Sequence, residues 1–298
     1  DLPDKEEAAP GADAYACWFA RGPAEESGLL RQDSLSAELL PPLQNWYKGK
    51  SPDNVLFISG HQGMGKTTAL ELITRQWRDC PVLRIDVEGK VTQREAVLAL
   101  IGSALDLPSL QSAAQLVEAD SHSPRRVLLV DHGENLFLAD VGKLEGMRAF
   151  LECVNAQCAN LYWVVALHRP AWEYLTKVFR REQRILTQFQ IPRWSAAEIR
   201  KLILSRHHRS HFRLQYDELL LAARATTETA NFRAAESRIF NLLWEQSNGN
   251  PEQALHLWIA AAQKLQDRLV RIGIPAHPPL TALASLSDDA CFVYAAIV

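Results

Sequence analysis

A glycine-rich segment between two apolar patterns is the feature that most constrains how this chain can fold. It reads Gly60-His61-Gln62-Gly63-Met64-Gly65-Lys66-Thr67-Thr68 and fits the pattern GxxxxGK[ST]. The apolar run at 54–59 predicts a buried strand before it, and the pattern at 66–77 predicts a helix after it. Because glycine permits tight turns and a helix N-terminus presents amides to an anion, the segment predicts a polyphosphate site that these residues line.

Two side chains of this loop offer chemistry that backbone amides lack. Lys66 is expected to reach the β- and γ-phosphates of a bound nucleotide, and Thr67 is expected to ligate Mg²⁺. A further acidic group is needed to hold the hydrated metal ion, and Asp131, which ends the apolar run 127–130, supplies one. Ligands of open α/β sheets bind beyond the carboxyl ends of the strands, which places Asp131 near the loop. Alternatively, an aspartate at a strand end caps the following turn.

Short apolar runs alternate with helical patterns up to Pro192, and this order predicts a parallel sheet with helices on both faces. After Pro192 the pattern is helical only and begins with a capping box formed by Ser195 and Glu198. We therefore expect an α/β fold, a parallel five-stranded P-loop NTPase sheet with flanking helices, followed by an all-helical lid domain. The expected strands are 54–59, 82–87, 127–131, 161–167 and 185–191, and the later helices cover 216–225, 231–246 and 251–270.

Composition also suggests boundaries between the parts of the chain. We expect a flexible N-terminal segment at 1–27, because it is rich in Asp, Glu, Ala, Gly and Pro. The P-loop core is expected at 28–192 and the helical domain at 193–274. Prolines mark a linker within 275–298, and the apolar helical pattern at its end is expected to begin a further domain that continues beyond this chain.

The overall composition narrows the class of protein. Apolar residues make up 47% of the 298 residues and charged residues 22%, which is typical of a globular protein with its own core. The net charge of −3 excludes a uniformly basic protein that coats nucleic acid. The five cysteines form no CxxC pair and predict free thiols in a reducing compartment. No apolar run is long enough to span a membrane, so we expect a cytoplasmic location.

The phosphate loop, the strand that ends in Asp131, a polar residue at the end of the fourth strand and the helical tail together resemble AAA+ and STAND-type ATPases. The resemblance covers about residues 28–298 and favours the replication-initiator-like branch, in which a helical lid precedes a winged helix. It implies ATP and Mg²⁺ as cofactors and assembly of the core into a homo-oligomer. It also implies further domains in the same chain.

The resemblance implies specific catalytic residues. The family's catalytic glutamate directly follows the metal-linked aspartate, but His132 stands there in this chain, and Glu134 follows two positions later. Glu134 is therefore the implied catalytic acid, with His132 as an alternative base. The first sensor of the family corresponds to His168, and the arginine finger that completes a neighbouring subunit's ATP site corresponds to Arg180 and Arg181.

Other family positions differ or are weakly marked. The second-sensor turn and helix of the family resemble the segment 248–255, but the family often carries an arginine where this chain has Glu252. The family's adenine pocket lies before the first strand, where Leu29, Leu30 and Arg31 stand. Glu252 therefore argues against a positive charge brought to the nucleotide by the lid.

Three functions remain open from the sequence. The first is an ATP-binding and ATP-hydrolysing AAA+/STAND-like switch module of a larger protein, which couples nucleotide state to self-assembly and effector control. The second is a nucleotide-gated scaffold with little hydrolysis, because no acid directly follows Asp131 and Glu252 replaces the arginine. The third is a DNA-binding initiator-like ATPase, although this chain contains no strongly basic recognition helix.

Overall fold

The chain divides into two compact units. Gly22–Arg193 form one unit, which we call the core unit, and Asp1–Arg21 with Trp194–Val298 form the other, which we call the second unit. The computed structural model describes residues 15–19, 31–139, 143–179, 187–217, 228–266, 268–275, 286–287 and 289–291.

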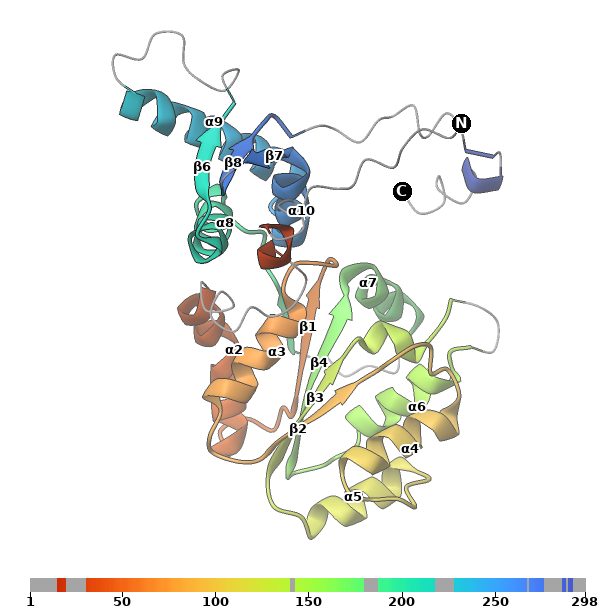
Figure 1. The fold of residues 1–298 in the computed structure, drawn as a ribbon. Coiled ribbons are helices and arrows are strands. Elements are labelled where there is room, and N and C mark those ends of the chain that lie inside the picture. The colour runs from red at the N-terminus through yellow and green to blue at the C-terminus, as the bar shows by residue number, and fades with distance from the viewer. Residues whose placement is uncertain are drawn as a thin grey trace. The chain divides into compact units, whose positions relative to one another are not determined.

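A five-stranded sheet forms the centre of the core unit, with the strand order β2-β3-β4-β1-β5. Every neighbouring pair of strands in it is parallel, so the expected five-stranded parallel sheet is confirmed (Figure 1). The strands are β1 (Val55–Gly60), β2 (Val82–Asp86), β3 (Arg126–Asp131), β4 (Leu161–His168) and β5 (Thr187–Gln190).

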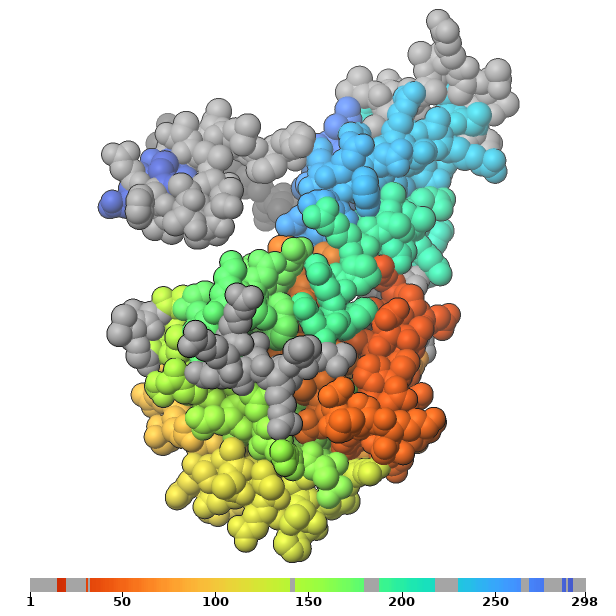
Figure 2. Space-filling model, turned by 180° about the vertical axis from the view of Figure 1, so that it is seen from behind, coloured from red at the N-terminus to blue at the C-terminus, as the bar shows by residue number. Residues whose placement is uncertain are grey.

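Helices cover both faces of this sheet, as the alternating sequence pattern predicts. One apolar cluster joins the sheet to α2 and α3, and the other joins it to α4, α5, α6 and α7. Figure 2, seen from behind, shows the same separation, with orange residues on one side of the core unit and yellow to green residues on the other. The helices are α2 (Gln32–Tyr47), α3 (Lys66–Gln76), α4 (Arg94–Ala104), α5 (Ala113–Ser121), α6 (Glu145–Val154) and α7 (Arg169–Val178).

The alternation of side chains along β3 decides which face the site occupies. Val127 and Leu129 pack with α2 and α3, whereas Leu128 and Val130 pack in the opposite cluster. Side chains two positions apart on a strand share a face. Asp131 therefore belongs to the face of the sheet that α3 covers, and α3 is the helix that begins at the end of the glycine-rich loop.

The second unit corrects the expectation of an all-helical lid. It contains helices α8 (Ala196–Ser210), α9 (Glu228–Ser247) and α10 (Pro251–Ala261), and the capping box at the start of α8 is confirmed. It also contains a three-stranded sheet in the order β6-β8-β7. The strands are β6 (Arg213–Tyr216), β7 (Ala262–Gln266) and β8 (Leu269–Ile272).

The helix expected at 251–270 ends at Ala261, and the chain continues in the strands β7 and β8. Val270 and Ile272 are buried while Arg271 is exposed, which is the pattern of a half-buried strand. Arg268 has a positive φ of 59° and lies in the turn that joins the antiparallel strands β7 and β8. The helix expected at 216–225 lies mostly outside the described residues.

The N-terminal segment expected to be flexible is in part packed into the second unit. Tyr15 is 1% exposed, and Phe19, at the end of the short helix η1 (Cys17–Phe19), is also buried. The Tyr15 hydroxyl accepts a hydrogen bond from Nε1 of Trp258 at 2.9 Å and bonds Nδ1 of His207 at 3.1 Å. A short apolar stretch of this segment therefore contributes to the core of the unit that holds α8 and α10.

Most of the 275–298 region lies outside the described residues, so the proposed winged helix stays a prediction. The proposed domain boundaries likewise stay predictions. Among the described residues, no helix combines the length and the apolar character that crossing a membrane requires. None of the five cysteines, all of which the structure describes, forms a disulfide bond.

Candidate functional site

The glycine-rich segment joins β1 to α3, which confirms the strand–loop–helix arrangement that the sequence predicts. Gly63 and Gly65 have φ values of +78° and +99°, a backbone conformation that side chains disfavour. Gly65 is the N-cap of α3, so the helix begins at Lys66 without a side chain over its first amides. The loop therefore presents a helix N-terminus, which attracts anions.

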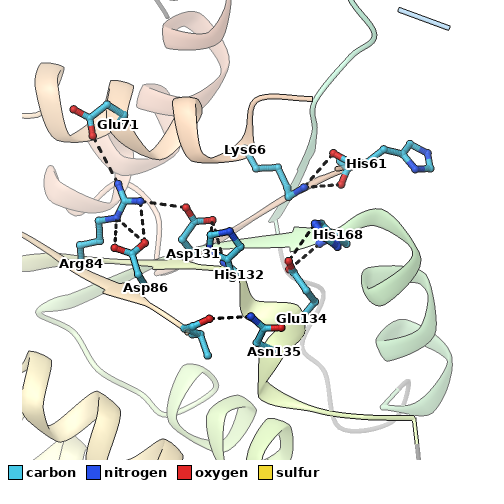
Figure 3. Close-up of polar contacts among 12 residues, drawn as sticks. His61, Lys66, Glu71, Arg84, Asp86, Asp131, His132, Glu134, Asn135 and His168 are labelled. Carbon is cyan, nitrogen blue, oxygen red and sulfur yellow. Dashed lines mark hydrogen bonds and ion pairs between the residues drawn. The ribbon is translucent and has the colours of Figure 1, made fainter. Parts of the chain in front are cut away.

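Lys66 is folded into the loop itself. Its side chain is buried, and its Nζ donates hydrogen bonds to the backbone carbonyls of Gly60 and His61, both at 3.1 Å (Figure 3). A buried ammonium group keeps its charge only where oxygen atoms surround it. The two carbonyl contacts therefore stabilise the lysine charge within the loop. Thr67 and Thr68 follow in the first turn of α3.

Asp131 is almost completely buried at the end of β3, with a side chain that is 1% exposed. Its Oδ1 accepts a hydrogen bond from the backbone amide of His132 at 2.9 Å. Its Oδ2 accepts one from Nη2 of Arg84 at 3.2 Å. A carboxylate at this depth would be costly without a cation beside it, and Arg84 provides that cation.

Arg84 links β2 to the predicted metal ligand, although the sequence motifs do not single it out. It also forms an ion pair with Asp86 at 2.9 Å and a longer one with Glu71 of α3 at 3.7 Å. Burial acts to lower the pKa of Arg84, but the hydrogen bond to Asp86 and the three carboxylate charges outweigh it and raise that pKa. The signal that could have found it is the period-two spacing of Val82, Arg84 and Asp86, which puts polar groups on the face that α3 covers.

Glu134 and His168, two of the predicted catalytic residues, are in direct contact. Oε1 of Glu134 lies 3.2 Å from Nε2 of His168, and Oε2 accepts the backbone amide of His168 at 3.1 Å. Glu134 belongs to the short helix η3 (Gly133–Leu136) and is 12% exposed. A Cβ atom on Gly133 would lie 2.6 Å from Cδ2 of Leu167, so glycine allows η3 to approach β4 this closely.

Positive charge gathers around this pair. Burial lowers the pKa of His168, the charge of Lys66 lowers it further, and the opposing effect of Glu134 does not restore it. His132 and Lys90 act in the same direction as Lys66. Nζ of Lys90 donates to the backbone carbonyl of Glu134 at 2.9 Å. Such an arrangement keeps the imidazole neutral near neutral pH and favours an anion in front of Lys66.

The oxygen atoms near the loop fit a magnesium ion by their chemistry. Mg²⁺ prefers carboxylate and hydroxyl oxygens over nitrogen and sulfur ligands. Thr67 offers a hydroxyl at the start of α3, and Asp131 offers a buried carboxylate. Ligand atoms of Asp86, Asp131 and His132 lie within 4.8 Å of one another, so two carboxylates and an imidazole meet at this edge of the sheet.

The structure tests only some of the other predicted residues. Arg180, Arg181, Leu29 and Leu30 lie outside the described residues, so their roles stay predictions. Arg31 donates to the backbone carbonyl of Pro192 at 3.0 Å and so connects the start of α2 to the segment after β5.

Glu252 lies in the second unit, in the first turn of α10. Its backbone amide donates to the N-cap side chain of Asn250 at 3.0 Å. The turn that resembles the family's second-sensor turn therefore caps the N-terminus of α10 through Asn250.

Comparisons with known proteins bear on the fold of the core unit. Residues 49–175 match the family model described as AAA domain. A comparison with curated protein sequences found no match. The segment that matches the AAA model contains the glycine-rich loop, Asp131, Glu134 and His168.

Solved structures are similar in fold at low sequence identity. Aeropyrum pernix ORC2 in ADPNP–ADP complexes is 14% identical, with a TM-score of 0.54 over 94% of this chain and 71% of that chain. The Walker-type ATPase PABY2304 of Pyrococcus abyssi is 15% identical, with a TM-score of 0.52 over 81% of this chain and 70% of that chain. The match to the ADP form of ORC2 spans 65% of that chain, at 13% identity, a TM-score of 0.49 and 82% of this chain. The parallel sheet and the two matches with TM-scores above 0.5 show that the core unit has a P-loop NTPase fold.

Proposed function

We propose that this chain is the ATP-binding module of a larger protein, that it hydrolyses ATP slowly, and that its nucleotide state controls self-assembly and an effector. One observation carries the proposal: a P-loop lysine, a buried carboxylate and a Glu–His pair lie around the ends of adjacent parallel strands. Ligands of parallel sheets bind at such strand ends. The AAA-domain match and the fold similarity to nucleotide-bound ORC2 support the same assignment.

The loop would hold the phosphates through its backbone amides and through Lys66. In the structure Nζ of Lys66 bonds the carbonyls of Gly60 and His61, and these bonds would be exchanged for phosphate oxygens. Thr67 and Asp131 would hold Mg²⁺, which neutralises charge on the phosphates when it is bound. Catalysis in such a site is positioning and charge stabilisation, without a covalent intermediate.

Glu134 is the residue that we propose to polarise the attacking water. Both of its oxygens contact His168, one through the imidazole and one through the backbone amide. A carboxylate oxygen has two lone pairs, so Glu134 can accept a bond from water while His168 fixes its orientation. The neutral imidazole makes His168 a hydrogen-bond donor to Glu134 and a positioning residue for it.

The first experiment compares nucleotide binding and phosphate release by the parent chain and by Lys66→Ala. We expect this variant to bind ATP about 10²-fold more weakly, because a charged phosphate contact is lost. Lys50→Ala, at an exposed lysine of the same unit, is the matched control and should behave like the parent. Equal binding and turnover by Lys66→Ala and the parent would contradict the site assignment.

A nucleotide-gated scaffold is the second candidate, and one observation favours it. The position directly after Asp131 holds His132, and the only acid that follows in η3, Glu134, is already paired with His168. Multiple-turnover phosphate release with Glu134→Gln separates the candidates. Release that falls about 10²-fold in this variant supports the enzyme, whereas negligible release by the parent supports the scaffold.

Assembly through Arg180 and Arg181 and a role at DNA remain parts of the proposal that rest on the family resemblance. The low net charge gives no support for tight DNA binding. A steep salt dependence of duplex binding would favour the initiator-like alternative, and absence of binding at low salt would remove it for this chain.

A further inference from the structure

Both oxygens of the carboxylate that would hold Mg²⁺ are already in use. Oδ1 of Asp131 accepts the backbone amide of His132, and Oδ2 accepts a guanidinium N–H of Arg84 at 3.2 Å (Figure 3). The contact at Oδ1 comes from the backbone amide of the next residue and brings no net charge. The contact at Oδ2 comes from a neighbouring strand and brings a full positive charge to the atom that a metal ion or its bound water would approach.

Arg84 has other carboxylates to return to if it leaves Asp131. Its Nε and Nη2 both donate to Asp86, at 2.9 to 3.1 Å, and its Nη1 lies 3.7 Å from Glu71. The Arg84 side chain is 30% exposed, whereas the side chain of Asp131 is 1% exposed. The guanidinium can therefore keep a bidentate partner while it gives up the buried one, so its release from Asp131 leaves no unpaired cation.

We propose that Arg84 takes the place of the metal's charge at Asp131 until a metal ion binds, and thereby sets how strongly Mg²⁺ promotes nucleotide binding. This inference rests on the nucleotide site proposed above. A metal ion must either displace the guanidinium from Oδ2 or bind next to it against charge repulsion. In both cases Arg84 weakens the metal's hold on Asp131, because like charges at short range in a buried site repel strongly.

The charge balance around Asp131 supports this direction. Arg84 forms ion pairs with Glu71, Asp86 and Asp131. Glu71 also pairs with Arg75 of α3, whereas Arg84 is the arginine that pairs with Asp131. Removing Arg84 would leave Asp131 as a buried charge without its cation. Such a carboxylate gains more from a metal ion than a paired one does, because metal binding then supplies the missing compensation.

The test measures binding of a fluorescent ADP, N-methylanthraniloyl-ADP, in EDTA and in excess Mg²⁺. The ratio of the two dissociation constants reports how much the metal strengthens binding, and it involves no turnover. We expect Arg84→Gln to raise this ratio by about fivefold or more over the parent, because a repelling charge is removed. Arg75→Gln is the matched control, since Arg75 pairs with the same Glu71 at 3.0 Å from α3, and it should leave the ratio unchanged.

Two further variants keep the test decisive. Arg84→Lys retains the charge and is expected to keep the ratio near that of the parent. Arg84→Met has an unbranched apolar side chain and replaces Arg84→Gln if thermal unfolding shows that the glutamine variant does not fold. It is expected to raise the ratio in the same way.

Each outcome decides for or against the inference. A raised ratio in Arg84→Gln or Arg84→Met, with Arg84→Lys near the parent, supports it. An unchanged ratio overturns it, and a lowered ratio would show instead that Arg84 orients Asp131 for the metal. An equal rise in Arg84→Lys would overturn the argument from charge. If the parent binds no ADP in either condition, the proposed nucleotide site fails, and the inference fails with it.

Discussion

Asp131 ends β3 and Glu134 lies in the short helix η3 that follows, yet their side chains pair with residues on different neighbouring strands. Asp131 pairs with Arg84 on β2, and Glu134 pairs with His168 on β4. These two strands flank β3 in the sheet. Arginine keeps its charge at any relevant pH, whereas the charge of an imidazole depends on pH. We call Asp131 with Arg84 the proposed metal side of the site and Glu134 with His168 the proposed water side. The proposed metal side contains a permanent cation, and the proposed water side contains a group whose charge depends on pH.

Removal of the buried charge on the metal side is expected to have the largest effect. Asp131→Asn should lower ATP turnover by about 10²-fold or more, because the metal ion loses its buried anionic partner. Binding of ADP in EDTA should remain, since the loop and Lys66 are unchanged. Phosphate release and fluorescent ADP binding measure the two quantities.

The matched control for this variant lies beside it on the neighbouring strand. Asp86 pairs in register with Asp131, but its side chain is 47% exposed. Asp86→Asn should therefore lower turnover far less than Asp131→Asn. An equal loss in both variants would mean that burial of Asp131 has no special role and would break the distinction between the two sides of the site.

The sequence predicts the core unit better than the second unit, and the strands explain why. Residues of β1 and β3 form nearly continuous apolar runs that end in the glycine-rich loop and in Asp131, so one window of sequence contains both the strand and its functional end. Arg84 gives no such signal. An arginine in the short strand β2 is ordinary by itself, and its importance comes from Asp131, which is distant in sequence and adjacent in the sheet.

In the second unit, the features that the sequence does not predict likewise depend on contacts between residues that are distant in sequence. Tyr15 lies in a polar, proline-containing segment, and its hydroxyl bonds Trp258 and His207, which are distant in sequence. The strands β6 and β8 have four residues each, which is too short for periodicity to separate them from a helix end. Short elements depend on their neighbours for stability, so their sequence alone specifies them weakly.

Substitution of Gly133 tests whether its close approach to β4 positions Glu134 against His168, and it is expected to lower the stability of the protein. A Cβ atom at this position would lie 2.6 Å from Cδ2 of Leu167 and 3.2 Å from the backbone oxygen of Ala166. Gly133→Ala should lower the free energy of unfolding by about 2 kcal/mol, because η3 must move away from β4. Urea denaturation measures this change. Turnover should fall as well, since the contact between Glu134 and His168 depends on the same approach.

A glycine in open space provides the comparison for this variant. Gly49 has a positive φ of 68°, and a Cβ atom added to it would meet nothing within 4 Å beyond its neighbours in the chain. Gly49→Ala should cost about 1 kcal/mol from backbone strain, and turnover should not change. If Gly133→Ala were as stable and as active as the parent, the close approach of η3 to β4 would not be what positions Glu134.

The smallest expected effect is the pH dependence that His168 adds to stability. Burial, followed by the charge of Lys66, lowers the pKa of His168 below its ordinary value of 6.5. Below 6.5 the unfolded chain therefore binds the proton more readily than the folded protein does. The stabilising contribution is fully present above 6.5 and is lost as the pH falls through the lowered pKa. The difference in the free energy of unfolding between the parent and His168→Gln should shrink from about pH 7.5 to about pH 5.

The variant His207→Gln is a control that distinguishes a pH effect on stability from a pH effect on ATP turnover. Burial, and then the charge of His208, lowers the pKa of His207 in the second unit, so His207→Gln should change the pH dependence of unfolding in the same direction. Only His168→Gln should also change the pH profile of ATP turnover, because only His168 contacts Glu134 among these two residues. A difference between the parent and His168→Gln that stays constant with pH would show that the pKa of His168 is not lowered. An equal change of the turnover profile in both variants would remove the assignment of His168 as the proton-sensitive residue on the water side of the site.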